Sequence, residues 1–423
     1  MAPGGVSAYH ASLLARCGAG WAADNMWLQG VAIVLPHVQR TWRVSDAWVG
    51  SLTSSLFAGM MLGAIAWGAC ADRYGRLFSY HRTLVVAAMG GSLLSLAPTW
   101  GTACVLSGLL GIGIGGSMPI DGTLFIESLP PQHHHWLTAL SVFFSLGSVV
   151  SALAALVLLV SVGASWRIFL LVLAGLTTVA AASRLGRFRT LESPAFLMAC
   201  GCEADAELVL QAMAPEGSTP EDAHMLMDEN PDEMGALFAP GQARTTMVLW
   251  VLWTLQSLAF TLFNAFYPLY LERKGGHTTP RPEAAVLRDV LAYAVSSVPG
   301  SLVGAALVRS AYGRYALPLT LTATGLALLL FLCAARAWHV VLAGMAVSLS
   351  ATTAYAVLYG QTPHAFPARV RGTGCAIASA ASRAAGIVAP LLAGVLLPRG
   401  LQGPIGVSAL VWGICAILAL CLN

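Results

Sequence analysis

The chain has 423 residues, of which 57% are hydrophobic and only 10% are charged, and its formal net charge is +3. Soluble globular proteins carry about 25% charged residues. This composition therefore excludes a soluble protein and indicates an integral membrane protein. No basic patch is interleaved with aromatic residues, so we expect no nucleic-acid partner. The nine cysteines are scattered without the spacing of a disulfide framework or a zinc site, so we expect no metal and no cofactor.

A helix needs about 20 apolar residues to cross the hydrocarbon core of a bilayer. Twelve such stretches occur, at 13–37, 47–71, 83–98, 102–122, 137–160, 166–184, 245–271, 286–309, 315–334, 338–360, 373–397 and 402–422. We therefore predict an all-α integral membrane protein with twelve transmembrane helices. The basic residues of the connections favour a multi-pass topology with both termini in the cytoplasm, and we expect the plasma membrane to be its location.

One long polar segment divides the predicted spans into two groups of six. We predict an N-terminal half at 1–184, a cytoplasmic central loop at 185–244 and a C-terminal half at 245–423. Within the loop, Glu203–Met213 and Glu221–Glu229 are typical of short amphipathic helices. A Tyr-Gly-Arg triplet follows both the second and the eighth span, at 74–76 and 312–314. This repetition indicates two pseudo-symmetric halves.

A cluster of glycine and charged residues follows the second span, in the stretch Gly68-Ala-Cys-Ala-Asp72-Arg73-Tyr-Gly75-Arg76. Glycine lets two helices approach closely, so we expect a close helix contact at Gly68. The Asp72 carboxylate can cap a neighbouring helix, and Arg73 and Arg76 can pair with acids across the bundle. Such contacts would hold one conformation and break in another. The alternative is a basic loop that only sets the topology.

This stretch resembles the signature between helices two and three of the major facilitator superfamily. Four further stretches resemble its sugar-porter and organic-ion-transporter branch: Gly111-Ile-Gly113-Ile-Gly115-Gly116-Ser-Met-Pro119-Ile-Asp121, Glu127-Ser-Leu-Pro130, Glu192-Ser193-Pro194 and Phe366-Pro367-Ala-Arg369-Val-Arg371-Gly372-Thr373-Gly374. Within that branch, Trp21-Ala-Ala-Asp24-Asn25-Met-Trp27 is similar to the synaptic-vesicle-protein-like members.

The resemblance implies a secondary active transporter and not an enzyme. It would move a small polar solute, an organic anion such as a carboxylate or a sugar, by alternating access. Proton coupling is left open, so the expected partners are the solute, the lipid bilayer and, in a coupled cycle, protons; the protein is expected to be a monomer. The implied gating residues are Gly68, Asp72, Arg73, Gly75, Arg76 and Glu127, with Arg369 and Arg371 at the start of helix eleven.

Three positions depart from the family pattern. Ser107 stands where an arginine usually opens helix four, and Ala195 stands where an arginine usually follows Glu-Ser-Pro. His364 replaces the usual glutamate two residues before the Phe-Pro pair. The first departure affects the usual proton-coupling arrangement, and the other two weaken the expected charge network. They keep a second hypothesis open, a non-transporting receptor or sensor on the same fold.

Ionisable side chains within a span are costly and usually functional. Asp24 lies in the first predicted span, Asp121 in the fourth and Arg383 in the eleventh. We interpret Asp24 as the group that binds and releases a proton; the alternative is a structural acid held by Asn25 or a backbone group. Asp121 either contacts the substrate or belongs to the gate with Glu127.

The surroundings of Arg383 resemble helix eleven of organic anion transporters, in which an arginine faces the substrate. A guanidinium group in a cavity attracts an anion or a paired carboxylate. The resemblance therefore implies an anionic substrate at Arg383. The alternative is an internal salt bridge with Asp24 or Asp121.

Polar and aromatic side chains also follow one face of the seventh span. Gln256, Phe260, Asn264 and Tyr267 are separated by four, four and three residues, which places them on one stripe of a helix. Such a stripe suits a substrate cavity, and the alternative is hydrogen bonding between helices. Further candidates in the tenth span are Tyr355 and Tyr359.

Overall fold

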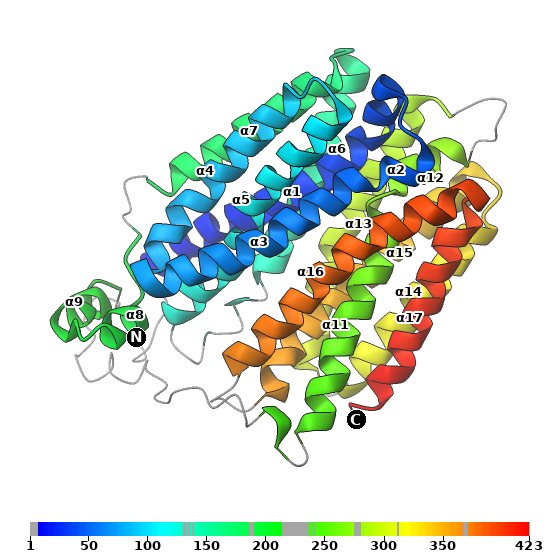
Figure 1. Cartoon of the computed structure of the whole chain (residues 1–423). Coiled ribbons are helices and arrows are strands. Elements are labelled where there is room, and N and C mark those ends of the chain that lie inside the picture. The colour runs from blue at the N-terminus through cyan, green and yellow to red at the C-terminus, as the bar shows by residue number, and fades with distance from the viewer. Residues whose placement is uncertain are drawn as a thin grey trace.

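The structure is a computed structural model. It describes residues 7–129, 133, 136–137, 139–185, 190–213, 237–239, 242–274, 281–310, 313–366 and 371–422. This part of the chain forms helices and their connections, without any strand. The predicted all-α architecture is therefore confirmed for the described residues (Figure 1).

The first half of the chain forms a bundle of long helices. Their bounds are α1 (Ala8–Trp42), α2 (Asp46–Val49), α3 (Ser51–Tyr74), α4 (Arg76–Ser95), α5 (Trp100–Glu127), α6 (Leu140–Ala155), η2 (Leu156–Ser161) and α7 (Trp166–Ser183). Two short helices follow, α8 (Pro194–Ala199) and α9 (Glu203–Met213). α9 has the predicted bounds and buries Ala206, Leu210 and Met213 on one face. The helix predicted at Glu221–Glu229 lies outside the described residues.

The second half repeats this arrangement. Its helices are α11 (Ala243–Asn264), α12 (Tyr267–Arg273), α13 (Glu283–Arg309), α14 (Gly313–Cys333), α15 (Ala337–Ala365), α16 (Arg371–Leu396), η5 (Leu397–Arg399) and α17 (Gln402–Leu420). Both ends of the chain lie at the same end of the bundle as α8 and α9 (Figure 1). We call this end the terminus side and the other end the opposite side.

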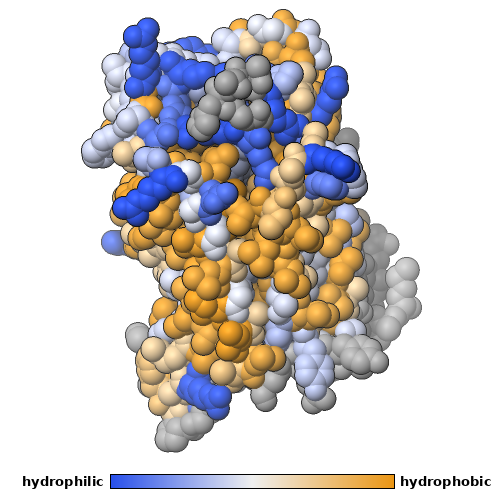
Figure 2. Space-filling view, turned by 90° about the vertical axis from the view of Figure 1, so that its right-hand side faces the viewer, coloured by the Kyte–Doolittle hydropathy of each residue, from blue (hydrophilic) through white to orange (hydrophobic). Residues whose placement is uncertain are grey.

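Among the described residues, ten helical segments are long and apolar enough to cross a membrane. Ten of the twelve predicted spans are thus confirmed by length and composition. The other two, α1 and α4, are long but less apolar, because α1 carries Asp24, Asn25 and Gln29 and α4 carries His81 and Arg82. Figure 2 shows hydrophobic side chains over the middle of the molecule and polar side chains gathered toward its top, as a bilayer requires.

The same helix pairs are in contact in both halves. In the first half α1 packs on α6, α3 on α5, and α4 on both α5 and α7. In the second half, the helices at equivalent places form the same pairs: α11 on α16, α13 on α15, and α14 on both α15 and α17. An internal structural repeat produces this correspondence.

The halves meet where α3 packs on α16 and where α6 packs on α13. Glycines allow the first contact to be close near the opposite side. A Cβ atom on Gly50 would lie 1.9 Å from the Pro390 carbonyl oxygen, and one on Gly386 would lie 2.4 Å from the Phe57 ring. Ser54 Oγ also donates a hydrogen bond of 2.8 Å to the Ile387 carbonyl.

The seventh predicted span, 245–271, is not one continuous helix. α11 ends at Asn264, and α12 begins at Tyr267 after a turn. Pro268 has no backbone N–H to donate to the Asn264 carbonyl four residues earlier, so the helix cannot continue regularly through this point. The turn changes the direction in which the side chains that follow it point.

Candidate functional site

A cavity lies between the two halves. Its walls come from α1, α3, α5 and α6 of the first half and from α11, α13, α15 and α16 of the second. Asp24 and Arg383 are its charged lining residues within the described chain. Many of the other polar groups are hydroxyls, including those of Ser145, Ser148, Ser257, Thr261, Ser297 and Ser301. Aromatic walls with a few directed polar groups suit a small polar solute.

Asp24 is fully buried in the middle of α1. Its carboxylate oxygens lie 2.5 Å and 2.6 Å from Ser117 Oγ on α5. Asn25 is engaged elsewhere, because its Nδ2 donates a 2.7 Å hydrogen bond to the Phe144 carbonyl on α6. The residue that holds Asp24 is therefore Ser117 and not the neighbouring asparagine.

Arg383 reaches across the cavity from α16 to the first half. Its Nη2 donates a 3.1 Å hydrogen bond to the Gly115 carbonyl on α5, and its Nη1 donates to Ser379 Oγ at 2.8 Å. Its Nε is buried without a partner in the described chain, and the guanidinium forms no ion pair there with Asp24 or Asp121. A buried guanidinium without a carboxylate partner is a ready site for an anion.

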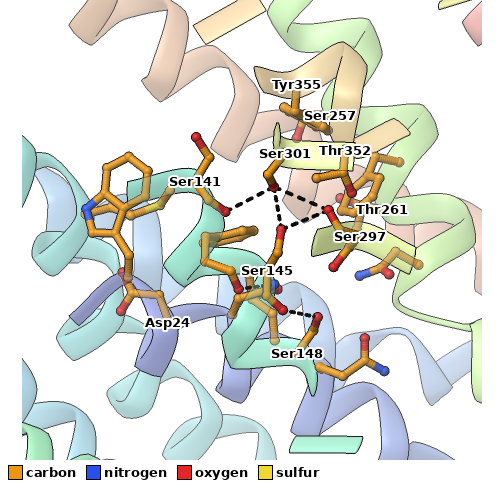
Figure 3. A pocket seen from close by; sticks show the side chains of 18 of the residues that line it. Asp24, Ser141, Ser145, Ser148, Ser257, Thr261, Ser297, Ser301, Thr352 and Tyr355 are labelled. Carbon is orange, nitrogen blue, oxygen red and sulfur yellow. Dashed lines mark hydrogen bonds between the residues drawn. The ribbon is translucent and has the colours of Figure 1, made fainter. Parts of the chain in front are cut away.

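Besides the hydrogen bond from Arg383 to Gly115, hydrogen bonds of serine hydroxyls also join the two halves, at the contact of α6 with α13 (Figure 3). The Oγ atoms of Ser145 and Ser301 lie 2.6 Å apart. Ser145 Oγ lies within 3.3 Å of the Ser297 carbonyl, and Ser301 donates to the Ser141 carbonyl at 3.2 Å. These contacts are between small neutral groups, so partners can change without leaving a charge unpaired.

Aromatic rings narrow the cavity toward the terminus side. The ring of Trp21 on α1 lies 6.4 Å from that of Tyr359 on α15, across the two halves. Trp253 meets Tyr359 edge-on at 4.6 Å, and Phe260 meets Tyr355 at 5.2 Å. The predicted candidates Tyr355 and Tyr359 both line the cavity.

The stripe predicted along the seventh span is only partly present. Phe260 and Asn264 line the cavity. Gln256 is fully buried outside it, and its amide group has no hydrogen-bond partner in the described chain. Tyr267 is also outside the cavity, and its ring packs on that of Tyr293 at 4.4 Å. In this conformation Tyr267 does not share the stripe, because the turn after Asn264 ends the helical spacing.

Asp121 does not line the cavity. It forms a 2.6 Å ion pair with Arg184 at the end of α7, and both side chains are completely buried. Arg184 also donates to the Tyr80 carbonyl, and its guanidinium lies 4.0 Å from the Tyr80 ring centre. Gly20 makes room for the pair, because a Cβ atom there would lie 2.0 Å from the Asp121 carboxylate. In this conformation Asp121 is paired with Arg184 and does not reach the cavity.

We expect Arg184→Met to destabilise the protein by about 3–5 kcal/mol, because it leaves the Asp121 carboxylate buried without a partner. Thermal unfolding in detergent measures the effect. The matched control is Arg82→Met, at an exposed arginine that stacks on Phe78, for which we expect less than about 1 kcal/mol. Equal unfolding temperatures for the two variants would contradict the assignment.

A charged network lies on the terminus side within the first half. Gly75 has a φ of 97°, which favours glycine, and it forms the turn between α3 and α4. The Glu192 carboxylate accepts hydrogen bonds from the backbone N–H groups of Arg76 (2.9 Å) and Leu77 (3.2 Å), and so caps α4. The Arg76 side chain contacts Glu127 at 3.4 Å. The expected pairing of Arg76 with an acid is therefore present.

Gly68, Asp72 and Arg73 do not form the expected contacts with other helices in the described part of the chain. Asp72 was expected to cap a neighbouring helix, but its side chain is 76% exposed and turns back to Arg76 at 2.7 Å. Arg73 is exposed. A Cβ atom on Gly68 would meet no described residue within 4 Å, so the expected close contact is absent among those residues. Arg369 and the side chain of Arg371 lie outside the described residues.

Ion pairs join the two halves on the opposite side. Arg273 on α12 contacts the Asp46 carboxylate on α2 at 2.6 Å and 2.9 Å, and it also reaches Gln39. Two further pairs join the halves there, Arg40 with Glu272 at 3.3 Å and His37 with Glu283 at 2.9 Å. Sequence reasoning placed all of these residues in connections except His37, the last residue of the first predicted span, and it assigned none of them to a gate.

Comparison with known proteins gives the family. Residues 12–422 match the sugar (and other) transporter family. The chain belongs to this family. It is a multi-pass membrane transporter of the major facilitator superfamily, of the sugar-porter type. The predicted family and fold are therefore confirmed.

The relatives cover most of this transporter. It is 29% identical to the MFS siderochrome iron transporter 1 of Ceriporiopsis subvermispora, over 92% of this chain and 82% of that one. It is 28% identical to the organic cation/carnitine transporter 7 of Arabidopsis thaliana, over 98% and 92%. It is 27% identical to the synaptic vesicle 2-related protein of Xenopus laevis, over 95% and 75%. Its fold is similar to that of the xylose transporter XylE from E. coli, with a TM-score of 0.74, 14% identity and coverage of 98% and 96%.

Two of the departures from the family pattern can be located in the transporter. Ser107 is fully buried, and its hydroxyl donates a 3.1 Å hydrogen bond to the Leu52 carbonyl of α3, away from the cavity. Ala195 is an exposed residue of α8. The side chain of His364 lies outside the described residues. The Ser107 hydroxyl is therefore engaged within the first half, and the hydrogen-bond partner of Asp24 is Ser117.

The site residues that sequence reasoning missed are mostly neutral or distant in the chain. Ser117 lay within a stretch quoted for its glycines, and Glu192 lay within a recognised motif without an assigned role. Arg184 is 63 residues from Asp121, so no local spacing connects them. The serines of α6 and α13 alternate with apolar residues in ordinary spans, and no local signal distinguishes them from serines that bond only within their own helix.

Proposed function

We propose that the protein is a secondary active transporter that moves a small organic anion, most simply a carboxylate, by alternating access with a proton carried on Asp24. The main support is that Arg383 is buried in the cavity without a carboxylate partner in the described chain. Binding an anion there compensates its charge. A sugar is the second candidate, favoured by the hydroxyl groups of the lining.

The conformation supports alternating access. With both termini in the cytoplasm, the ion pairs of Asp46, Arg40 and His37 would close the outer side. On the terminus side, α3 has open space at Gly68, while Trp21 and Tyr359 narrow the passage. We therefore interpret this state as inward-open and partly occluded. The XylE structure to which this fold is similar has a partially occluded inward open conformation.

The Asp46–Arg273 pair gives a test of the outer gate. We expect Asp46→Arg, which places two like charges together, to raise the population open on the opposite side about fivefold. Spin labels at the exposed positions 43 and 336, in a variant whose cysteines are replaced by serine, report the distance between the halves. The double variant Asp46→Arg/Arg273→Asp restores the pair and should restore the distance. If Asp46→Arg leaves the distance distribution between the two labels unchanged, the Asp46–Arg273 pair is not part of a gate.

The terminus-side latch is expected to form in the other state. Asp72, Arg73 and Arg76 would then contact the start of α16 near Arg371, and Gly68 would be covered. We expect Asp72→Asn to lower transport several-fold without impairing folding, because it weakens the outward-open state by about one charge-assisted hydrogen bond. Normal uptake at normal surface expression would rule out the latch role of Asp72.

The function itself is tested by uptake into proteoliposomes of a labelled panel of carboxylates, sugars and amines. We expect saturable uptake of a carboxylate and none of the amines. Uptake of sugars alone would replace the anion by a sugar as the substrate. A compound that binds to folded protein without any flux would favour the alternative, a receptor or sensor on the same fold.

A further inference from the structure

Ser117 on α5 makes the closest contact that Asp24 has. The Ser117 hydroxyl lies 2.5 Å and 2.6 Å from the two carboxylate oxygens and 3.2 Å from the Ile114 carbonyl of its own helix. Both side chains are fully buried. A distance of 2.5–2.7 Å is typical of a hydroxyl that donates to an ionised carboxylate.

A hydroxyl group has one hydrogen to donate, and it can accept as well. When Asp24 is ionised, Ser117 donates its hydrogen to the carboxylate. When Asp24 carries a proton, the carboxylic acid is itself the donor, and it donates to Ser117 Oγ. The hydrogen of Ser117 is then free to turn to the Ile114 carbonyl. Both protonation states of Asp24 are thus hydrogen-bonded without moving a helix.

The charged groups near Asp24 are hydrogen-bonded or paired with other residues, so that Ser117 is the hydrogen-bond partner of Asp24 in the described chain. Asp121 on α5 and Arg184 at the end of α7 pair with each other at 2.6 Å. Arg383 on α16 bonds to the carbonyl of Gly115, two residues before Ser117, and does not pair with Asp24. α6, which packs on α1, carries no charged residue. α12 brings Glu272 and Arg273 to the far end of α1, beside Arg40 and Gln39.

We propose that Ser117 is the positioning residue of the proton site: its Oγ accepts a hydrogen bond from Asp24 when Asp24 is protonated, and its own hydrogen then turns from Asp24 to the Ile114 carbonyl. This inference rests on the proposed function of Asp24. Because Gly115 and Ser117 belong to one turn of α5, the same turn holds Asp24 from one half and Arg383 from the other.

The test needs no transported substrate. Infrared difference spectra between acidic and alkaline buffer detect the carbonyl band of a protonated carboxyl group in the reconstituted full-length protein. Asp24→Asn assigns the band by removing it. We expect Ser117→Ala to displace the band and to change the proton affinity of the site about tenfold, which is about one pH unit, because the carboxyl group loses its hydrogen-bond partner.

Two variants make the result specific. Ser117→Thr keeps the hydroxyl and should retain the wild-type band. Ser148→Ala removes a cavity hydroxyl that bonds to the Ser145 carbonyl and not to Asp24, and should also leave the band unchanged. If the band of Ser117→Ala is the same as that of wild type, even when the unfolding temperature is lower, the role of Ser117 is overturned and the proton role of Asp24 is not affected. A wild-type protein without a band would overturn the proton role of Asp24 and this inference with it.

Discussion

Replacing Arg383 by glutamine is expected to reduce carboxylate uptake about 100-fold, because the substrate anion loses a charge-assisted hydrogen bond in a buried site. Arg383→Lys keeps the charge but loses the planar pair of donors, so we expect a loss of about tenfold. Initial uptake rates over a range of carboxylate concentrations in proteoliposomes measure both effects.

The same variant separates a binding role from a structural one. Arg383 and Arg184 are both buried arginines, but only Arg184 has a carboxylate partner in the described chain. Removing an unpaired buried charge relieves a desolvation cost, so Arg383→Gln should leave the unfolding temperature unchanged or raise it. Full uptake by Arg383→Gln, or a fall in stability like that of Arg184→Met, would show that Arg383 is part of the scaffold.

Replacing Asp24 by asparagine is expected to abolish proton-driven accumulation while exchange continues. The amide group is close in shape to the carboxyl group and can still bond to Ser117, but it cannot bind and release a proton. We expect the accumulation ratio to fall to about one and counterflow to stay within about twofold of wild type, because an uncharged group at this position resembles the protonated state. Both quantities are measured with the same labelled carboxylate.

Two outcomes would contradict this account of Asp24. If accumulation by Asp24→Asn still responds to a proton gradient, the transported proton must be carried by another group. Loss of exchange together with accumulation, at normal stability, would make Asp24 a substrate contact. Asn25→Ala is a suitable control, since Asn25 lines the cavity beside Asp24 but bonds to the Phe144 carbonyl.

The sequence was sufficient for the parts of the fold that depend on hydrophobic length. Apolar length located ten of the twelve predicted spans, and the polar segment near 185–244 predicts where the two halves divide. The two least apolar helices illustrate the limit of this signal. Asp24, Asn25 and Gln29 are polar and line the cavity, and they lower the mean hydropathy of α1. The residues of the candidate site therefore make α1 harder to recognise as a membrane span.

The candidate site was predictable only for side chains whose chemistry is unusual in a membrane. Asp24 and Arg383 line the cavity, as a charge within a span suggests. Asp121 has the same chemistry but is paired with Arg184, and only the packing of α5 against the end of α7 reveals this. The proline that ends α11 moved Tyr267 away from the stripe, and spacing alone could not indicate it.

The most direct test of the account is to follow solute and proton together. Wild-type proteoliposomes containing a pH indicator would receive an external labelled carboxylate without an imposed gradient, with empty liposomes and Arg383→Gln correcting for passive entry of the acid. We expect carboxylate uptake with simultaneous acidification of the lumen in wild type, and uptake without acidification in Asp24→Asn during exchange. Carboxylate uptake by wild type without any acidification beyond the controls would contradict coupling through Asp24.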